Sequence, residues 1–232
     1  MTAAYTADLP DAFFAKLRAL AFSIKPTVPE LAEWMLAVMY SESGINAGAS
    51  NSIGCVGLLG FCQTTSGYTQ DQIHAMGPTQ QLDVVGPFVK SYASHIDRRP
   101  NVYQGNFLPA SFARGTSLGT VLAAQGGTGY GGAEDAFYKA NPLLDYTKDG
   151  KITVGDLELR LKAIEKDKRY QEALARLRAA PSPALTIAGQ LTGVALAGLV
   201  AWGALAAYRS PEVRKAMRDS VSDARAMLRR HA

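Results

Sequence analysis

Over most of its length the sequence lacks a surplus of charge of either sign. The 232 residues carry 24 Lys and Arg against 20 Asp and Glu, a net charge of +4. The last segment, 209–232, holds seven basic and three acidic residues, and this surplus of four equals the net charge of the whole chain. The rest is balanced at 17 to 17. We therefore expect no nucleic-acid-binding surface in the main part of the chain.

Cysteine and histidine are also scarce. The three histidines are scattered without metal-ligand spacing, so they receive no role. Cys55 and Cys62 can form a bridge if the chain between them folds back, but two cysteines in a glycine-rich segment are more often small buried hydrophobic residues. The segment from Met1 to Pro10 has neither a basic residue nor an apolar run. It therefore lacks the pattern of a secretory signal peptide, and we expect any export to use another route.

Apolar residues make up 47% of the chain, which excludes a disordered protein and allows one sizeable domain with appendages. Residues 11–24 have the spacing of an amphipathic helix, with Phe13, Leu17, Leu20 and Ile24 on one face. Shorter helices are predicted at 71–76, 80–97 and 118–124, separated by glycine and proline. The expected fold class is mainly α.

A longer helix is predicted to begin near Thr27, where Thr27 and Glu30 have capping-box spacing. Its buried face carries apolar residues at helical spacing, namely Leu31, Trp34, Met35, Val38 and Met39. Glu42 follows in the last turn, before Gly44 can end the helix. Apolar surroundings and the negative end of the helix dipole both raise a carboxyl pKa toward the range of a general acid. The plainer alternative is a helix-end glutamate that points into water.

The residues after Glu42 favour the catalytic interpretation. Glu42-Ser43-Gly44, then a polar loop of small residues, then the run from Gly54 to Phe61 (GCVGLLGF) resemble the signature of soluble lytic transglycosylases and goose-type lysozymes. The likeness is closest to the domains of this group in bacteriophage particles, and it covers roughly residues 27–157. One departure is Gly60, which stands where the family has a glutamine that lines the sugar groove.

This resemblance implies a lysozyme-like helical domain over residues 1–143. Glu42 would be the sole catalytic acid and base, which protonates the glycosidic oxygen between N-acetylmuramic acid and N-acetylglucosamine. The sugar's own hydroxyl then closes a 1,6-anhydro end, or water enters as in a lysozyme. The residues expected at the sugar are Ser43, Gly57, Leu58, Phe61 and Tyr130.

Residues 144–157 have the spacing of an EF-hand calcium loop. Numbered from Asp145, oxygen-bearing residues stand at positions 1, 3, 5, 9 and 12, glycine at 6 and a carbonyl donor at 7. The expected metal ligands are Asp145, Thr147, Asp149, Lys151 and Asp156. Threonine at position 3 and the short aspartate at 12 predict modest calcium affinity, or a loop that keeps its shape without metal. A similar Asp-Gly-Lys-Ile-Thr stretch closes many of the phage transglycosylase domains.

The C-terminal part divides into three segments. Residues 158–183 are densely charged and predict a solvated spacer helix. Residues 184–208 contain no charge; as a helix they span about 37 Å, more than a bilayer core of about 30 Å, which predicts a transmembrane helix. The alternatives are a buried core helix or an oligomer-forming one. Residues 209–232 predict a basic amphipathic helix that lies on an anionic membrane.

Together these features predict a muralytic enzyme of a phage virion, anchored in a membrane and acting on peptidoglycan in the host periplasm or cell wall. Its expected partners are glycan strands, a membrane, and other virion proteins or a second copy bound through residues 184–208. No cofactor is required for the chemistry. The alternative is a structural virion or ejection-channel protein that retains an inactive lysozyme-like fold, and Gly60 is the feature that favours it.

Overall fold

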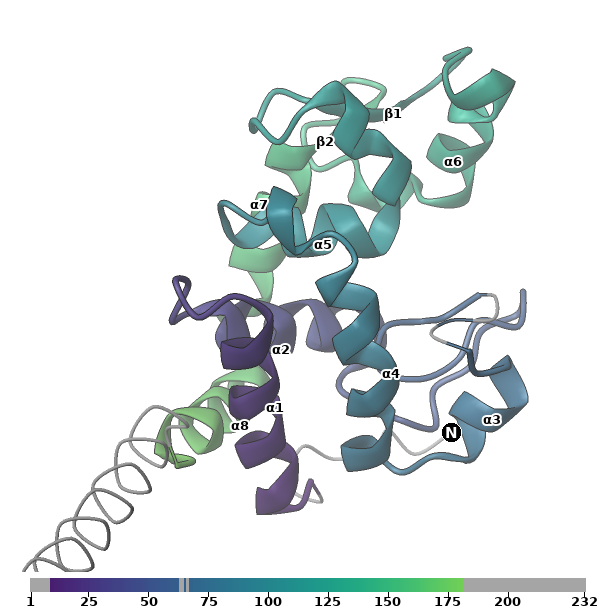
Figure 1. Cartoon of the computed structure of the whole chain (residues 1–232). Coiled ribbons are helices and arrows are strands. Elements are labelled where there is room, and N and C mark those ends of the chain that lie inside the picture. Colours follow the sequence, from purple (N-terminus) through teal and green to yellow (C-terminus); the bar gives the residue numbers. More distant parts are fainter. Residues whose placement is uncertain (1–8, 63–64, 66, 182–232) are drawn as a thin grey trace, which may run out of the picture. The chain divides into compact units, whose positions relative to one another are not determined.

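The chain divides into two units, Met1–Ser182 and Pro183–Ala232. The computed structural model describes residues 9–62, 65 and 67–181, all within the first unit. The predicted transmembrane helix at 184–208 and the basic tail at 209–232 lie outside the described residues. In the part that is described, no helix is both long enough and apolar enough to cross a membrane. The described unit is mainly helical, as predicted, and it is drawn in colour in Figure 1.

Helix α2 (Leu31–Ser43) is the element around which the unit is built. It contacts α1 (Asp11–Ile24), α5 (Arg99–Phe107), α7 (Val154–Ile164) and α8 (Lys168–Ala179). Because neighbours surround it, its middle turns are buried on almost every side: Met35, Leu36, Ala37, Val38 and Met39 are each at most 1% exposed. The position of α2 explains why its sequence is more apolar than one buried face requires.

The start of α2 differs from the prediction. The helix begins at Leu31, with Glu30 as its N-cap and no side-chain cap. Backbone turns occupy the preceding residues, since Val28 N–H donates to the Lys25 carbonyl (3.0 Å) and Leu31 N–H to the Val28 carbonyl (3.1 Å). Thr27 therefore lies in a backbone turn before the helix and is not its N-cap, which the expected capping box required.

Helix α1 has the predicted amphipathic character, with Phe13, Phe14 and Leu17 at most 1% exposed. It packs against α4 (Pro78–Lys90), as Figure 1 shows. The two helices approach closely at Gly86, where an added Cβ would lie 2.5 Å from Leu20 Cδ1. Before α4, the short helix α3 (Gln70–Ala75) begins with a capping box between Thr69 and Gln72.

Two short strands form the sheet: β1 (Val121–Ala124) pairs antiparallel with β2 (Lys151–Thr153). Helix α6 (Glu134–Ala140) lies beside β1 (Figure 1). The prediction of a helix at 118–124 was wrong, because this short apolar run finds a strand partner that is distant in sequence. Short 3-10 helices join the elements at Ala93–His95, Pro109–Arg114, Tyr130–Gly132 and Pro142–Leu144.

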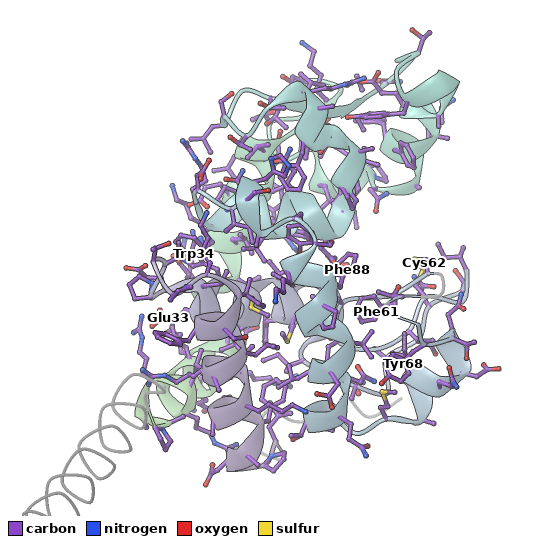
Figure 2. The ribbon with its side chains drawn as sticks, viewed as in Figure 1. Glu33, Trp34, Phe61, Cys62, Tyr68 and Phe88 are labelled. Carbon is purple, nitrogen blue, oxygen red and sulfur yellow. A yellow bond between two sulfur atoms is a disulfide. The ribbon has the colours of Figure 1, made fainter. Side chains whose placement is uncertain are left out.

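The predicted solvated spacer helix at 158–183 is corrected by the structure. Two helices, α7 and α8, occupy residues 154–179 and both pack against α2. Helix α8 buries Tyr170, Ala173, Leu174 and Leu177. Its end is also fixed to the unit by ion pairing, since the Arg178 guanidinium makes two hydrogen bonds of 2.9 and 2.7 Å with the Glu33 carboxylate on α2. Glu33 is labelled in Figure 2.

Candidate active site

Glu42 lies in the last turn of α2, as predicted. Gly44 follows as the C-cap with φ 65°, and its N–H donates to carbonyl groups of the last turn. Glycine is the residue that takes this left-handed conformation without strain. The helix end therefore fixes the position of Glu42 and places its carboxyl at the negative end of the helix dipole.

The surroundings of Glu42 raise its pKa, and loss of hydration is the largest cause. Two groups act in the opposite direction: a hydrogen bond from Tyr103 and the positive charge of Arg160 both lower the pKa. The residue nevertheless remains exposed to solvent. Protein atoms surround the Glu42 carboxyl, but solvent still reaches it. This contact with solvent limits how far the Glu42 pKa is raised.

The Gly57–Gly60 turn lies beside this carboxyl. Val56 and Phe61 exchange two backbone hydrogen bonds (3.0 and 2.8 Å), so the four residues between them form the turn of a hairpin. Gly57 and Gly60 have φ of 80° and 64°. An added Cβ on Gly60 would lie 3.6 Å from Glu42 Oε2. The two parts of the sequence that carry the family resemblance therefore meet in space.

Two side chains hold the turn in place. The Ser43 hydroxyl lies 2.9 Å from the Leu58 carbonyl. From the other side, buried Gln81 on α4 accepts from the Leu58 N–H (2.9 Å) and donates to the carbonyls of Ala47 and Ile73 (both 2.8 Å). Sequence reasoning missed Gln81, whose only sequence signal is a polar residue among the buried positions of α4.

Cys55 and Cys62 form a disulfide across the base of the hairpin. They flank the Val56 and Phe61 pair, so the bridge closes the segment that contains the glycine turn. Figure 2 labels Cys62 and Phe61 on this segment. The interpretation of the cysteines as small buried hydrophobic residues was wrong, because the loop folds back far enough to join them.

Tyr103 on α5 is the group that contacts the Glu42 carboxyl. It is 3% exposed, and its hydroxyl lies 3.1 Å from the Ser41 hydroxyl, which donates to it. Burial and the neighbouring Glu42 charge both raise the Tyr103 pKa. Tyr103 therefore remains protonated and can donate its hydroxyl proton to the Glu42 carboxylate. No local sequence pattern links Tyr103 to Glu42, which lies 61 positions earlier in the chain.

Three of the expected sugar-binding residues are buried parts of the scaffold. Gly57 and Leu58 are buried, and Phe61 is 4% exposed. The Phe61 ring packs edge to face on Phe88 of α4, with ring centres 5.5 Å apart (Figure 2). The side chains of Leu58 and Phe61 fix the hairpin to the core, and contact of these residues with a sugar stays a prediction from the sequence.

Tyr130 belongs to another part of the described unit, the glycine-rich loop at 126–132. The Arg114 guanidinium lies over its ring, 4.1 Å from the centre, and pairs with the Glu134 carboxylate through contacts of 2.9 and 3.1 Å. The Tyr130 hydroxyl is buried and has no hydrogen-bond partner in the described part of the chain. None of the interactions described for Tyr130 brings it to Glu42.

The predicted calcium loop is closed by its own hydrogen bonds. Asp145 accepts from the N–H groups of Asp149 (3.2 Å) and Gly150 (3.0 Å) and from the Tyr138 hydroxyl (2.9 Å). Burial raises the Asp145 pKa, but these hydrogen bonds outweigh it and the pKa is lowered. Asp156, which is fully buried, accepts from the N–H groups of Thr147 (3.0 Å) and Thr153 (2.9 Å).

A third expected ligand follows the same pattern. Asp149 accepts from the N–H of Lys151 (3.0 Å), where β2 begins. Within the described residues, no group of three or more His, Cys, Asp or Glu side chains is placed to hold a metal ion. The three carboxylates accept hydrogen bonds from backbone N–H groups of the loop, and calcium binding stays a prediction from the sequence.

Asp145→Ala is expected to lower the free energy of unfolding by about 1–3 kcal/mol, because three donors lose their acceptor. Thermal unfolding followed by circular dichroism measures this loss. Titration calorimetry with millimolar calcium, on wild type and on the variant, tests the metal separately. Heat of binding in wild type alone would support the calcium prediction, whereas no heat in either protein would make the loop a structural turn.

A shallow pocket of about 410 Å³ lies over this loop. Tyr138, Leu143 and Tyr146 contribute its apolar surface, and Gln125 and Lys148 its polar groups. Glu42 is not among the lining residues. Leu143 is 87% exposed and widens the apolar rim.

The comparisons with known proteins do not identify a family for this chain. No family model matches it, and neither a curated protein nor a solved structure does.

Proposed function

We propose that the described unit is a peptidoglycan-cleaving domain in which Glu42 is the catalytic acid and base. The observation that carries this proposal is the meeting of the α2 end with the Gly57–Gly60 turn, where a Cβ added to Gly60 would lie 3.6 Å from Glu42 Oε2. A carboxyl with a raised pKa at an open site is the group that protonates a glycosidic oxygen.

The groups that shift the Glu42 pKa support a mechanism with a single carboxylate. Among the described residues, Tyr103 and Arg160 are the side chains that act on the Glu42 carboxyl, and neither is a carboxylate. Glu42 would first donate its proton to the oxygen between the two sugars. As a carboxylate it would then take a proton from the sugar's own hydroxyl, which closes the 1,6-anhydro end, or from water, which gives hydrolysis.

Zymography of the full-length protein on purified peptidoglycan tests this function. We expect a cleared band, and mass analysis of the released muropeptides distinguishes anhydro ends from hydrolysed ones. The alternative is a virion protein that keeps the fold as a docking module. It is favoured by Gly60, which leaves no side chain beside Glu42 on the turn. An intact, folded protein that releases no muropeptide would overturn the cleavage proposal and favour this alternative.

The carriage of this domain by a phage virion, and its anchoring through residues 184–208, are further parts of the proposal. The anchoring rests on the charge-free run in the sequence, and the carriage by a virion rests on the resemblance to domains of bacteriophage particles. Full-length protein is expected to partition with membranes or to need detergent, whereas a truncation after Ala180 stays in the aqueous phase. Phase separation in a detergent that clouds on warming measures the difference. Full-length protein that stays monomeric in detergent-free buffer would contradict the anchor, and a detergent-free oligomer of defined size would support an assembly helix.

A further inference from the structure

Arg160 on α7 lies against the end of α2 that carries Glu42. Its Nε donates to the Ser41 hydroxyl at 2.9 Å, and a terminal nitrogen donates to the Ser41 carbonyl at 3.3 Å. The two residues are 119 positions apart in the sequence. This contact fixes the guanidinium next to the residue that precedes Glu42.

The hydrogen bonds from Arg160 to Glu42 form a chain with one direction. An arginine side chain can only donate, so the Ser41 hydroxyl accepts from Arg160 and its own proton is free for another partner. That proton goes to the Tyr103 hydroxyl at 3.1 Å. Tyr103 in turn uses its proton for the Glu42 side chain. Each hydroxyl accepts one bond and donates one, an arrangement in which successive bonds polarise one another.

The charge of Arg160 is not neutralised by a salt bridge within the part of the chain that the structure describes. The side chain is half-buried, and it also hydrogen-bonds Tyr146, a neutral residue of the loop at 144–157. Burying part of a guanidinium without an ion pair costs desolvation free energy. A group that benefits from its charge would offset part of this cost. The charge of Arg160 acts on the Glu42 carboxylate.

We propose that Arg160 is a positioning residue for Glu42: it orients the Ser41 and Tyr103 hydroxyls so that Tyr103 donates to the Glu42 carboxylate. The catalytic consequence rests on the proposed function, while the geometry does not. An acid that also acts as a base must be stable in both forms. Packing around Glu42 favours the protonated form, and the Arg160 chain favours the ionised one.

The groups facing Glu42 are few, which makes the effect of Arg160 measurable. Tyr103 comes from α5 and Arg160 from α7, while the Gly57–Phe61 turn contributes no titratable side chain. Because Arg160 also hydrogen-bonds Tyr146, the loop at 144–157 and helix α7 become part of the site's support.

The test uses full-length protein with ¹³C-labelled glutamate, in which the Glu42 carboxyl signal is identified by its loss in Glu42→Gln. In Arg160→Met the Glu42 carboxyl is expected to titrate at a higher pH than in wild type, because the stabilising charge and the oriented donor are lost. Arg160→Lys keeps the charge, so the pH at which Glu42 titrates should lie between those of wild type and Arg160→Met. Lys162→Met, on the exposed side of the same helix, makes the same change in net charge and should leave Glu42 unchanged.

Peptidoglycan cleavage provides the second measurement. In Arg160→Met we expect kcat to fall by about 10–100-fold, because a catalytic group that is no longer held in place loses effective concentration. The alkaline limb of the pH profile should move upward with the Glu42 titration. A folded Arg160→Met protein in which Glu42 titrates as in wild type would overturn the proposal. If wild-type protein cleaves nothing, but Glu42 titrates at a higher pH in Arg160→Met than in wild type, the proposed function is refuted and the positioning role is supported.

Discussion

Replacing Glu42 by glutamine is expected to remove peptidoglycan cleavage while the fold stays intact. Glutamine keeps the shape of the side chain and can still accept the hydrogen bond from Tyr103, but it has no acidic proton to donate. General acid–base help contributes a factor of about 100 to 10,000, so the rate should fall at least that far. Muropeptide release per unit time, measured by mass spectrometry, checks the result.

Glu30→Gln is the matched control, because Glu30 is an exposed glutamate at the start of the same helix. It should cleave at the wild-type rate. The native protein holds a proton on Glu42 more tightly than the unfolded chain does, since the Glu42 pKa is raised by lost hydration. Ionisation at alkaline pH therefore costs stability, and Glu42→Gln should melt no lower than wild type there. Undiminished cleavage by Glu42→Gln would exclude Glu42 as the acid.

Breaking the Cys55–Cys62 disulfide is expected to give the second largest effect. The bridge closes a loop with a sequence separation of 7, for which chain entropy gives a stabilisation of about 2 kcal/mol. The double variant Cys55→Ala, Cys62→Ala should therefore melt about 4–8 °C below wild type. Cleavage should also fall, since the hairpin that places Gly60 beside Glu42 is no longer closed at its base.

Reduction provides the control for this experiment. Dithiothreitol should lower the melting temperature of wild type toward that of the double variant and leave the double variant where it was. Equal melting temperatures for oxidised wild type and the double variant would mean that the bridge contributes nothing to stability. A loss of cleavage without a loss of stability would place its effect in the turn alone.

The elements predicted well were those that depend on neighbours in the sequence. The apolar spacing of α1, the helix that carries Glu42 and its end at Gly44 follow from side-chain periodicity and from the left-handed conformation that glycine adopts. These signals are complete within a few turns of chain. Glu42 could be chosen as the candidate acid for the same reason, since its helix position and apolar neighbours are both local.

The errors came from partners that are remote in sequence. The run at 118–124 became a strand because Val121 pairs with Thr153, a partner that periodicity cannot indicate. The charges of residues 158–183 suggested a solvated helix, yet α8 carries a buried stripe of Tyr170, Ala173, Leu174 and Leu177. Charge density is a property of the solvent-facing side, and it concealed the narrower apolar face.

The sequence by itself therefore determined the helical class of the described unit, the helix end at Glu42 and the glycine turn that follows it. Only the tertiary structure decided which groups surround the carboxyl. Tyr103 reaches Ser41 across 62 positions and Arg160 reaches it across 119, while Gln81 joins the turn from α4. The physical reason is that a hydrogen bond depends on distance and direction in space, and helix packing sets both. No local pattern records them.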